Sequence, residues 1–299
     1  MKKLLNYLLA AATLVLAACG GQNDPEQWTA HWENGKLPGK FSISANKQVS
    51  FSQGNLQYQA STSTWRFALH QYDFIGMNPG NTTATDLRAT QADWIDLFGW
   101  GTSGYMNQQP YSVSQELRDY GTGLNSTADL TGTNYDWGRY NAISNGGDRA
   151  GLWRTLNYDE WEYILSDRPQ ADDLRGQATI NNIGGYIILP DDWEMPEGLN
   201  FKPDPCNMSA NAYTFAQWFL MEQAGALFLP FAGTRNLLEI SRTLKNGDYA
   251  TASMYNPAGF ADLWGRQNYY VAIAQTYAAS LQSRGFHWGC SVRLAQDVK

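Results

Sequence analysis

Charged residues, cysteines and histidines are all scarce in this chain of 299 residues. Asp, Glu, Lys and Arg together make up 16% of the sequence, which holds only three cysteines and three histidines. A structural zinc site usually takes four nitrogen or sulfur ligands, and the chain has neither a Cys-x-x-Cys pair nor a histidine-rich cluster. We therefore expect no zinc site and no bound cofactor.

Calcium is the metal ion that the sequence excludes least firmly. It needs several oxygen ligands, which the stretches DFIGMNPGNTTATD (residues 73–86) and PDDWEMPEG (residues 190–198) could offer. Neither stretch has the spacing of an EF-hand loop. A structural calcium ion in one of these loops is therefore kept as an alternative.

Positive charge is too sparse for one class of partner. The chain has 21 Lys and Arg residues against 28 Asp and Glu residues, which gives a net charge of −7. Loss of Lys2 and Lys3 with a leader peptide would leave 19 basic residues and a net charge of −9. Because binding to phosphates needs concentrated Lys and Arg, we expect no nucleic-acid partner.

The N-terminal apolar run, from Leu4 to Ala18, is too short to be a typical membrane-spanning helix. Lys2 and Lys3 precede it, and it ends in Leu16-Ala17-Ala18-Cys19. This is the pattern of a bacterial secretory signal that ends in a lipobox. It predicts a signal peptide over residues 1–18 that is removed from the mature chain.

Cys19 is then the lipidated first residue of the mature protein. Its acyl chains would attach the protein to a membrane, and we expect no other membrane contact. Residues 19–39 are polar and contain Gly and Pro, which predicts a flexible tether. Asp24 and Glu26 close behind the cysteine favour an outer-membrane lipoprotein that faces the cell exterior.

Two further cysteines, Cys206 and Cys290, follow the lipidated one. They could form a disulfide in an oxidising compartment, but the sequence alone cannot place them close together. We leave this pairing open.

Hydrophobic alternation predicts strands at the start of a single domain over residues 40–299. Val49 and Phe51, then Leu56 and Tyr58, alternate with polar residues, and the turn-forming ASTST precedes WRFAL. These segments predict an early hairpin. A short helix is predicted at ATQADWIDLFG (residues 89–99), among loops that extend from residue 76 to residue 150.

Two later segments carry helix-capping signals. Asn157 with Glu160, and Thr214 with Gln217, each form a capping box followed at once by a tryptophan. We expect both tryptophans to dock in the core, and Gly225 to end the second helix. The stretches GGYIILP (residues 184–190) and GALFLPFAG (residues 225–233) predict buried strands.

The last 55 or so residues predict an antiparallel sheet with aromatic turns that closes against the early hairpin. Within it, the stretch RGFHWGCSVRL (residues 284–294) places His287 three residues before Cys290. On a strand such residues point to opposite faces, so a nucleophile and base would meet only across a bulge. We expect instead a closing strand from Cys290 to Leu294, and a preceding turn that faces a ligand.

Several segments resemble known proteins. They are GKFSISANKQVSFSQGNLQYQASTSTWRFALHQYDFIG, WIDLFGWGTSGY, YDWGRYNAISNGG, GLWRTLNYDEWEYIL, GALFLPFAGTR and GCSVRLAQDV. They are similar to segments of Bacteroidetes-type surface lipoproteins, which look related to the Fibrobacter-type paralogous domain and, more distantly, to formylglycine-generating enzymes. The resemblance runs from about Gly39 to Lys299. It implies an α+β, C-type lectin-like fold, with two helices packed on antiparallel sheets and long ordered loops.

The resemblance extends to the variable proteins of diversity-generating retroelements, which vary a ligand-binding face near the C-terminus. The corresponding window here is about residues 245–290. Tyr, Trp and Arg supply much of the energy at binding surfaces, with Ser and Asn as adaptable partners. The ligand-binding residues that we expect are Tyr249, Ser253, Tyr255, Asn256, Phe260, Asp262, Trp264, Arg266, Asn268, Tyr270, Gln275, Tyr277, Arg284, His287 and Trp288.

These observations predict a non-enzymatic, surface-anchored lipoprotein that binds a protein or glycan on another cell, phage or host surface. One alternative is an oxidase of the formylglycine-generating type, although Cys206 and Cys290 do not reproduce the closely spaced late cysteine pair of that family. Another alternative is a structural subunit associated with an adhesin. Joint replacement of Trp264, Arg266 and Tyr270 by alanine is predicted to abolish binding while leaving stability nearly unchanged.

Overall fold

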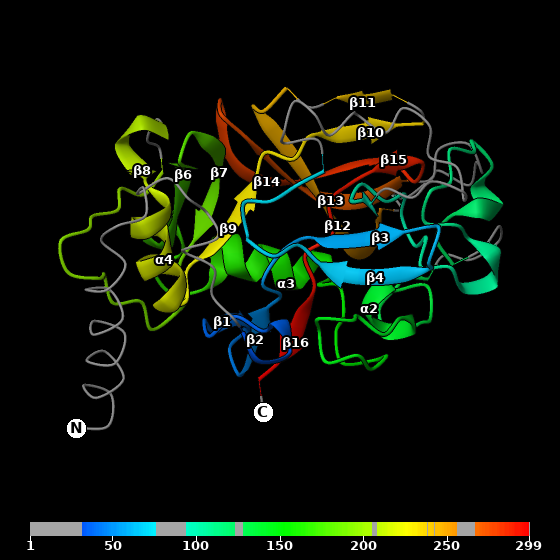
Figure 1. Ribbon diagram of the computed structural model, residues 1–299, viewed down its shortest axis with the longest axis horizontal. Coiled ribbons are helices and arrows are strands. Elements are labelled where there is room, and N and C mark those ends of the chain that lie inside the picture. Colours follow the sequence, from blue (N-terminus) through cyan, green and yellow to red (C-terminus); the bar gives the residue numbers. More distant parts are fainter. Residues whose placement is uncertain are drawn as a thin grey trace.

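The computed structural model describes residues 32–75, 94–122, 128–204, 208–237, 239–241, 243–255 and 267–298 (Figure 1). It has a mixed α+β architecture of small, mostly antiparallel sheets and few helices, as expected. The strands are β1 (Phe41–Ser44), β2 (Lys47–Phe51), β3 (Leu56–Gln59), β4 (Thr64–Phe67), β5 (Trp94–Ile95), β6 (Arg175–Ile180), β7 (Ile183–Ile188), β8 (Ala212–Tyr213), β9 (Leu227–Pro230), β10 (Thr234–Asn236), β11 (Glu239–Ser241), β12 (Asn246–Tyr255), β13 (Gln267–Ala274), β14 (Tyr277–Gly285), β15 (Trp288–Gly289) and β16 (Ala295–Asp297).

The helices are short, and both predicted capping boxes are confirmed. In each box the cap side chain accepts the backbone N–H three residues on, and that residue's side chain accepts the N–H of the cap. Trp161 and Trp218, one in each helix, are buried in the core. The α-helices are α2 (Trp137–Tyr140), α3 (Tyr158–Glu162) and α4 (Phe215–Gln223), and the single turns are η2 (Glu33–Gly35), η3 (Tyr105–Asn107), η4 (Leu117–Asp119), η5 (Tyr163–Asp167), η6 (Ala171–Leu174) and η7 (Met208–Asn211).

Gly225 stops α4 as predicted. Its φ of +103° lies in a region that other residues rarely adopt. A Cβ at this position would also lie 2.8 Å from the Cα of Gly39, so the end of α4 packs directly on the entry of the domain.

The two ends of the described chain meet in one sheet of order β1-β2-β16. Ala295 pairs with Phe51, so the last strand lies beside the second. The chain is already packed before residue 40, because Leu37 is buried and donates its N–H to the carbonyl of Phe51 at 2.9 Å. The part of the expected tether from Trp32 to Gly39 therefore belongs to the folded domain.

The early hairpin and the buried strands are confirmed, whereas one helix prediction is wrong. β3 pairs with β4 in the predicted hairpin, and β7 pairs with β9 in the sheet β8-β6-β7-β9. Of the segment expected to be helical, the structure describes residues 94–99, in which Trp94–Ile95 form a strand paired with β3 and none of the other residues is helical. The ring of Trp94 lies 3.6 Å from the Arg66 guanidinium, and this tertiary contact was not visible in the local pattern.

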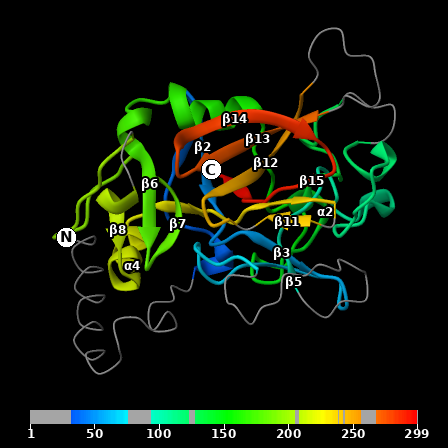
Figure 2. The ribbon, with the colours of Figure 1, turned by 90° about the horizontal axis from the view of Figure 1, so that it is seen from above.

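The late antiparallel sheet is confirmed as β12-β13-β14 (Figure 2). Its strands do not pair with the early hairpin. The last part of the chain reaches the N-terminal strands through β16, which pairs with β2, and through Val292, whose carbonyl accepts the N–H of Leu56 at 2.9 Å. The extended closing segment also differs from the prediction, since the strand that joins β2 begins at Ala295, just after Leu294.

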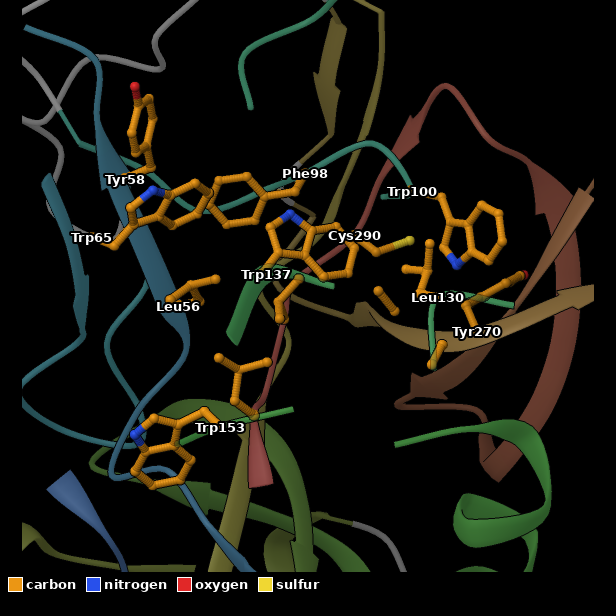
Figure 3. Packing of buried hydrophobic residues seen from close by; sticks show 14 of the residues in the cluster. Leu56, Tyr58, Trp65, Phe98, Trp100, Leu130, Trp137, Trp153, Tyr270 and Cys290 are labelled. Carbon is orange, nitrogen blue, oxygen red and sulfur yellow. The ribbon is translucent and has the colours of Figure 1, made fainter. Parts of the chain in front are cut away.

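Alternation along β13 divides the core between the two faces of this sheet. Tyr270 and Ala272 join a cluster that contains Trp100, Trp137 and Cys290 (Figure 3). Val271 and Ile273 join a second cluster with Trp161 of α3, which packs on the other face. A third cluster lies between α4 and the β6–β9 strands, at one side of the molecule in Figures 1 and 2.

In the part of the chain that the structure describes, no helix has the length and apolar character to cross a membrane.

Candidate functional site

The expected ligand-binding residues fall into three groups. Asn256, Phe260, Asp262, Trp264 and Arg266 lie outside the described residues. Tyr249, Ser253, Asn268 and Tyr270 are buried, whereas Tyr255, Gln275, Tyr277, Arg284, His287 and Trp288 are at least partly exposed.

The buried group serves the scaffold, which corrects the expectation that these side chains face a ligand. Tyr249 is fully enclosed, and its hydroxyl donates to the carbonyl of Pro230 at 2.9 Å. The Ser253 hydroxyl donates to the carboxylate of Asp129 at 3.0 Å. Asn268 donates to the carbonyl of Tyr269 at 3.0 Å. Side chains along a strand point alternately to the two faces of its sheet. Because this sheet has a hydrophobic core on both faces, both sets of side chains are buried there.

Arg284 is the centre of the exposed group. It lies on β14 and forms an ion pair with Asp248 of β12, across the middle strand. Its guanidinium also donates to the Tyr270 hydroxyl at 2.8 Å. The same group lies 3.9 Å from the ring centroid of Tyr270 and 4.9 Å from that of Trp288. We call Asp248, Tyr270, Arg284 and Trp288 the arginine stack.

The arginine stack is largely desolvated and therefore rigid. The side chain of Arg284 is 20% exposed and that of Asp248 only 3%. Burial raises the pKa of Asp248 to about 6, although the adjacent Arg284 charge opposes this shift. A cation held between two rings and a buried carboxylate has few alternative positions.

Polar groups continue the site along β14. The Tyr270 hydroxyl donates to the side chain of Gln282 at 2.9 Å, and the Gln282 amide donates to Ser280 at 3.3 Å. Gln282 is exposed, and Ser280 and Arg284 lie on the same face because they are separated by even numbers of residues. This face therefore presents amide and hydroxyl groups beside the stack.

Past the end of β14, His287 lies beside Trp288 of the arginine stack. His287 and Trp288 are both partly exposed, and their ring centroids lie 6.2 Å apart. Burial, followed by the charge of Arg235, lowers the pKa of His287. Trp288 is held by pairing with Asn236 of β10. The turn expected over residues 284–288 is shorter in the structure, because Arg284 lies in β14 and Trp288 in β15, which leaves only Phe286 and His287 in the turn.

Cys290 is a free thiol packed in the core. Burial raises the pKa of the thiol to about 12, so it stays protonated at neutral pH. Its sulfur approaches the carbonyl of Trp288 at 3.9 Å. A catalytic cysteine needs the opposite environment, which stabilises the thiolate. Cys206 lies outside the described residues, so the disulfide between Cys206 and Cys290 that the sequence left open is not tested.

The metal alternatives gain no support from the described residues. Within those ranges no group of three or more His, Cys, Asp or Glu side chains comes together. In the loop expected to offer calcium ligands, the carboxylate of Asp191 already accepts hydrogen bonds from Ser42, Gln48 and Arg168. Most of the other candidate loop, residues 76–86, lies outside the described residues.

Sequence reasoning missed Asp248, Ser280 and Gln282. Asp248 and Arg284 are 36 positions apart, and only the pairing of β12 and β14 with β13 brings them together. The alternation of Ser280, Gln282 and Arg284 was a usable signal, because these polar residues recur at every second position of a strand.

Comparison with known proteins adds no assignment to this geometry. No protein-family model, no curated protein and no solved structure matches the chain.

Proposed function

We propose that this chain is a surface-anchored lipoprotein that binds a protein or glycan without catalysing a reaction. The binding face consists of the exposed parts of Arg284 and Trp288, the exposed part of β14, and His287, while the buried Asp248 and Tyr270 hold Arg284 in place. The observation that carries the proposal is the arginine stack itself. A Tyr–Arg–Trp arrangement fixed before binding lowers the entropic cost of association, and these three residue types dominate binding energies.

A C-type lectin-like assignment of the domain is part of this proposal. It is supported by the resemblance of the segments between Gly39 and Lys299, and by the arrangement of short capped helices on antiparallel sheets. Retroelement-driven variation of residues 245–290 is proposed on the resemblance alone. A reverse transcriptase gene beside a near-copy of the 3′ end of the gene would support it.

Joint replacement of Trp264, Arg266 and Tyr270, the binding test predicted from the sequence, is not suited to this structure. Tyr270 is 4% exposed, so replacing it together with Trp264 and Arg266 would damage the core as well as the surface. Trp288→Ala removes one wall of the arginine stack while leaving the buried Tyr270 in place. Tyr140→Ala is the matched control, because this ring is 42% exposed and lies on α2.

Ligands are first found on a glycan array and on a displayed library of extracellular protein domains, each probed with the purified full chain. We expect ligands of the proposed face to bind at least tenfold more weakly to Trp288→Ala and within twofold of normal to Tyr140→Ala. Equal binding by all three proteins would contradict the assignment of the face. Absence of any ligand in both screens would favour the structural-subunit alternative.

The oxidase alternative is tested separately. Copper-loaded protein is incubated with a cysteine-containing peptide, and aldehyde formation is measured by mass spectrometry. Because Cys290 is buried and protonated, we expect no product. Product that disappears in Cys290→Ser would overturn the non-enzymatic assignment.

A further inference from the structure

A cluster of three tyrosines lies on the other face of the same sheet. Tyr269 of β13 lies with its ring centroid 4.4 Å from that of Tyr158 in α3 and 5.0 Å from that of Tyr255 in β12. The interplanar angles are 54° and 83°, so the rings meet at an angle instead of stacking flat. We call these residues the tyrosine trio.

The trio is separate from the arginine stack. Tyr269 and Tyr270 are consecutive on β13, and consecutive strand residues point to opposite faces. Tyr270 accordingly packs against Arg284, whereas Tyr269 packs against α3. A ligand of one face therefore does not occupy the other.

Backbone contacts fix the elements that carry the three rings. Tyr158 is the first residue of α3, and its N–H donates to the Ser253 hydroxyl at 3.0 Å. Asp129 accepts from that hydroxyl and, at 2.8 Å, from the N–H of Met254, next to Tyr255. Helix and strand are thus joined at the trio, so the rings are held together before any partner arrives.

All three rings remain partly exposed. The described part of the chain does not enclose them as it encloses Val271 and Ile273 farther along β13. Instead, the trio presents aromatic surface to solvent at the N-terminal end of α3. Clustered and prearranged aromatic rings of this kind are typical of binding surfaces.

Among the described residues, the side-chain carboxylates that act on the pKa values of Tyr158 and Tyr269 lie on and just after α3. Burial raises the pKa of Tyr158, and the charges of Glu162, Asp159 and Asp167 raise it further. Asp159 acts on the pKa of Tyr269 in the same direction. The chain as a whole carries a net charge of −7. These carboxylates and the negative faces of the rings favour a cation at the trio.

We propose that the tyrosine trio is a second docking surface, which takes arginine side chains of a partner protein. A cation is favoured by the acidic surroundings, and a planar guanidinium can lie against one ring while its edge meets another. An ammonium group lacks this planar contact, so arginine is expected to bind more tightly than lysine. This inference goes beyond the proposed function, because it concerns another face and another partner group.

The test uses the full chain and capped peptides with three arginines separated by glycines. Matched peptides carry lysine, or citrulline, which keeps the shape of arginine but lacks its charge. Affinities are measured by calorimetry at low ionic strength. The wild-type chain is expected to bind the arginine peptide at least threefold more tightly than the lysine peptide, and the citrulline peptide at least tenfold more weakly.

Two kinds of variant locate the site. Tyr158→Leu and Tyr269→Leu keep an apolar side chain but remove the aromatic face, and each is expected to weaken arginine binding about three- to fivefold. Asp159→Asn combined with Glu162→Gln should weaken it by a similar factor without touching a ring. The controls are Tyr140→Leu for the rings and Glu239→Gln for the charges, since both residues are exposed on other elements. Circular dichroism checks that each variant is folded.

The binding data on the variants and the peptides distinguish an arginine site at the trio from attraction by overall charge. Normal binding by both tyrosine variants, or equal losses in the controls, would show attraction by overall charge alone and overturn it. Equal affinity for the arginine and citrulline peptides would also overturn it. If a tyrosine variant unfolds, the charge variant and the peptide comparison decide. Loss of ligand in Trp288→Ala with normal arginine binding would show that the two faces act independently.

Discussion

Arg293 is a charged side chain that the protein encloses completely. It is 1% exposed, and its guanidinium donates to the side chain of Asn55 and to the carbonyls of Ser52, Gln71 and Phe228 at 3.0 to 3.2 Å. Burial lowers its pKa to about 10, which still leaves it charged at neutral pH. One side chain thus connects the strands near the N-terminus with β9.

Replacing Arg293 should be among the most damaging changes to stability. Arg293→Ala leaves three carbonyls and an amide oxygen without their donor, and we expect a loss of about 3–5 kcal/mol in the free energy of unfolding. Arg293→Lys keeps the charge but not the forked donors, so it should recover less than half of that loss. Urea denaturation measures both. A lysine variant as stable as wild type would contradict the role of the fork.

Glu222 predicts how stability depends on pH. It is 5% exposed and accepts from the Gln71 amide at 3.0 Å, and burial raises its pKa to about 7. The unfolded chain binds this proton only near the ordinary pKa of about 4.3. The folded state therefore binds more protons between these values, and the contribution of Glu222 to stability falls as the pH rises from about 4.5 to 7.

Glu222→Gln removes that titration and keeps the acceptor oxygen. The variant is expected to lie close to wild type in stability at pH 4.5 and to become more stable than wild type at pH 8, by up to about 3 kcal/mol. Thermal unfolding at a series of pH values measures the difference. A constant difference across that range would mean that Glu222 keeps its ordinary pKa.

At the scale of elements, the parts that depend on local chemistry could be predicted from the sequence. Capping boxes act within three residues, and hairpins and buried strands follow from alternation, so α3, α4, the β3–β4 hairpin and β7 lay where expected. The strand at Trp94 was missed because its partner is β3 and its ring contacts Arg66. Whether such a short segment becomes a helix or a strand depends on contacts with residues that are distant in the sequence.

The cap of α4 gives a prediction at the same scale. Thr214 accepts the N–H of Gln217 at 3.2 Å, one of the donors that a helix start leaves without a partner. Thr214→Ala should lower the free energy of unfolding by about 1 kcal/mol, whereas Thr214→Ser should keep most of it. Chemical denaturation of the two variants compares the hydroxyl with the methyl group. Equal losses would assign the effect to packing.

At the scale of the whole molecule, the sequence predicted the fold class but only part of the candidate site. Tyrosines of β12 and β13 were expected to face a ligand, yet Tyr249 and Tyr270 fill the core. The sheet has a core on both faces over most of its length, so alternation cannot tell which side is exposed. That depends on what packs against each face.

The expected lipid anchor also belongs to this scale. Trp32 lies thirteen positions after Cys19, which limits the distance from the expected anchor to the domain to about 45 Å. Cys19→Ser should move the protein from the membrane fraction to the soluble fraction, and Cys206→Ser should leave it in place. Fractionation followed by immunoblotting measures both. A membrane-bound Cys19→Ser chain would refute acylation at this residue.

The pairing of Ala295 with Phe51 also sets when the molecule can be finished. A ribosome adds roughly 5–20 residues per second, so β2 must wait roughly 10–50 seconds after its synthesis before β16 exists. Until then the edge of β2 that pairs with β16 has no strand beside it, whereas β1 can already pair with the other edge. The sheet that joins the two ends of the described chain is therefore one of the last parts of the molecule that can form.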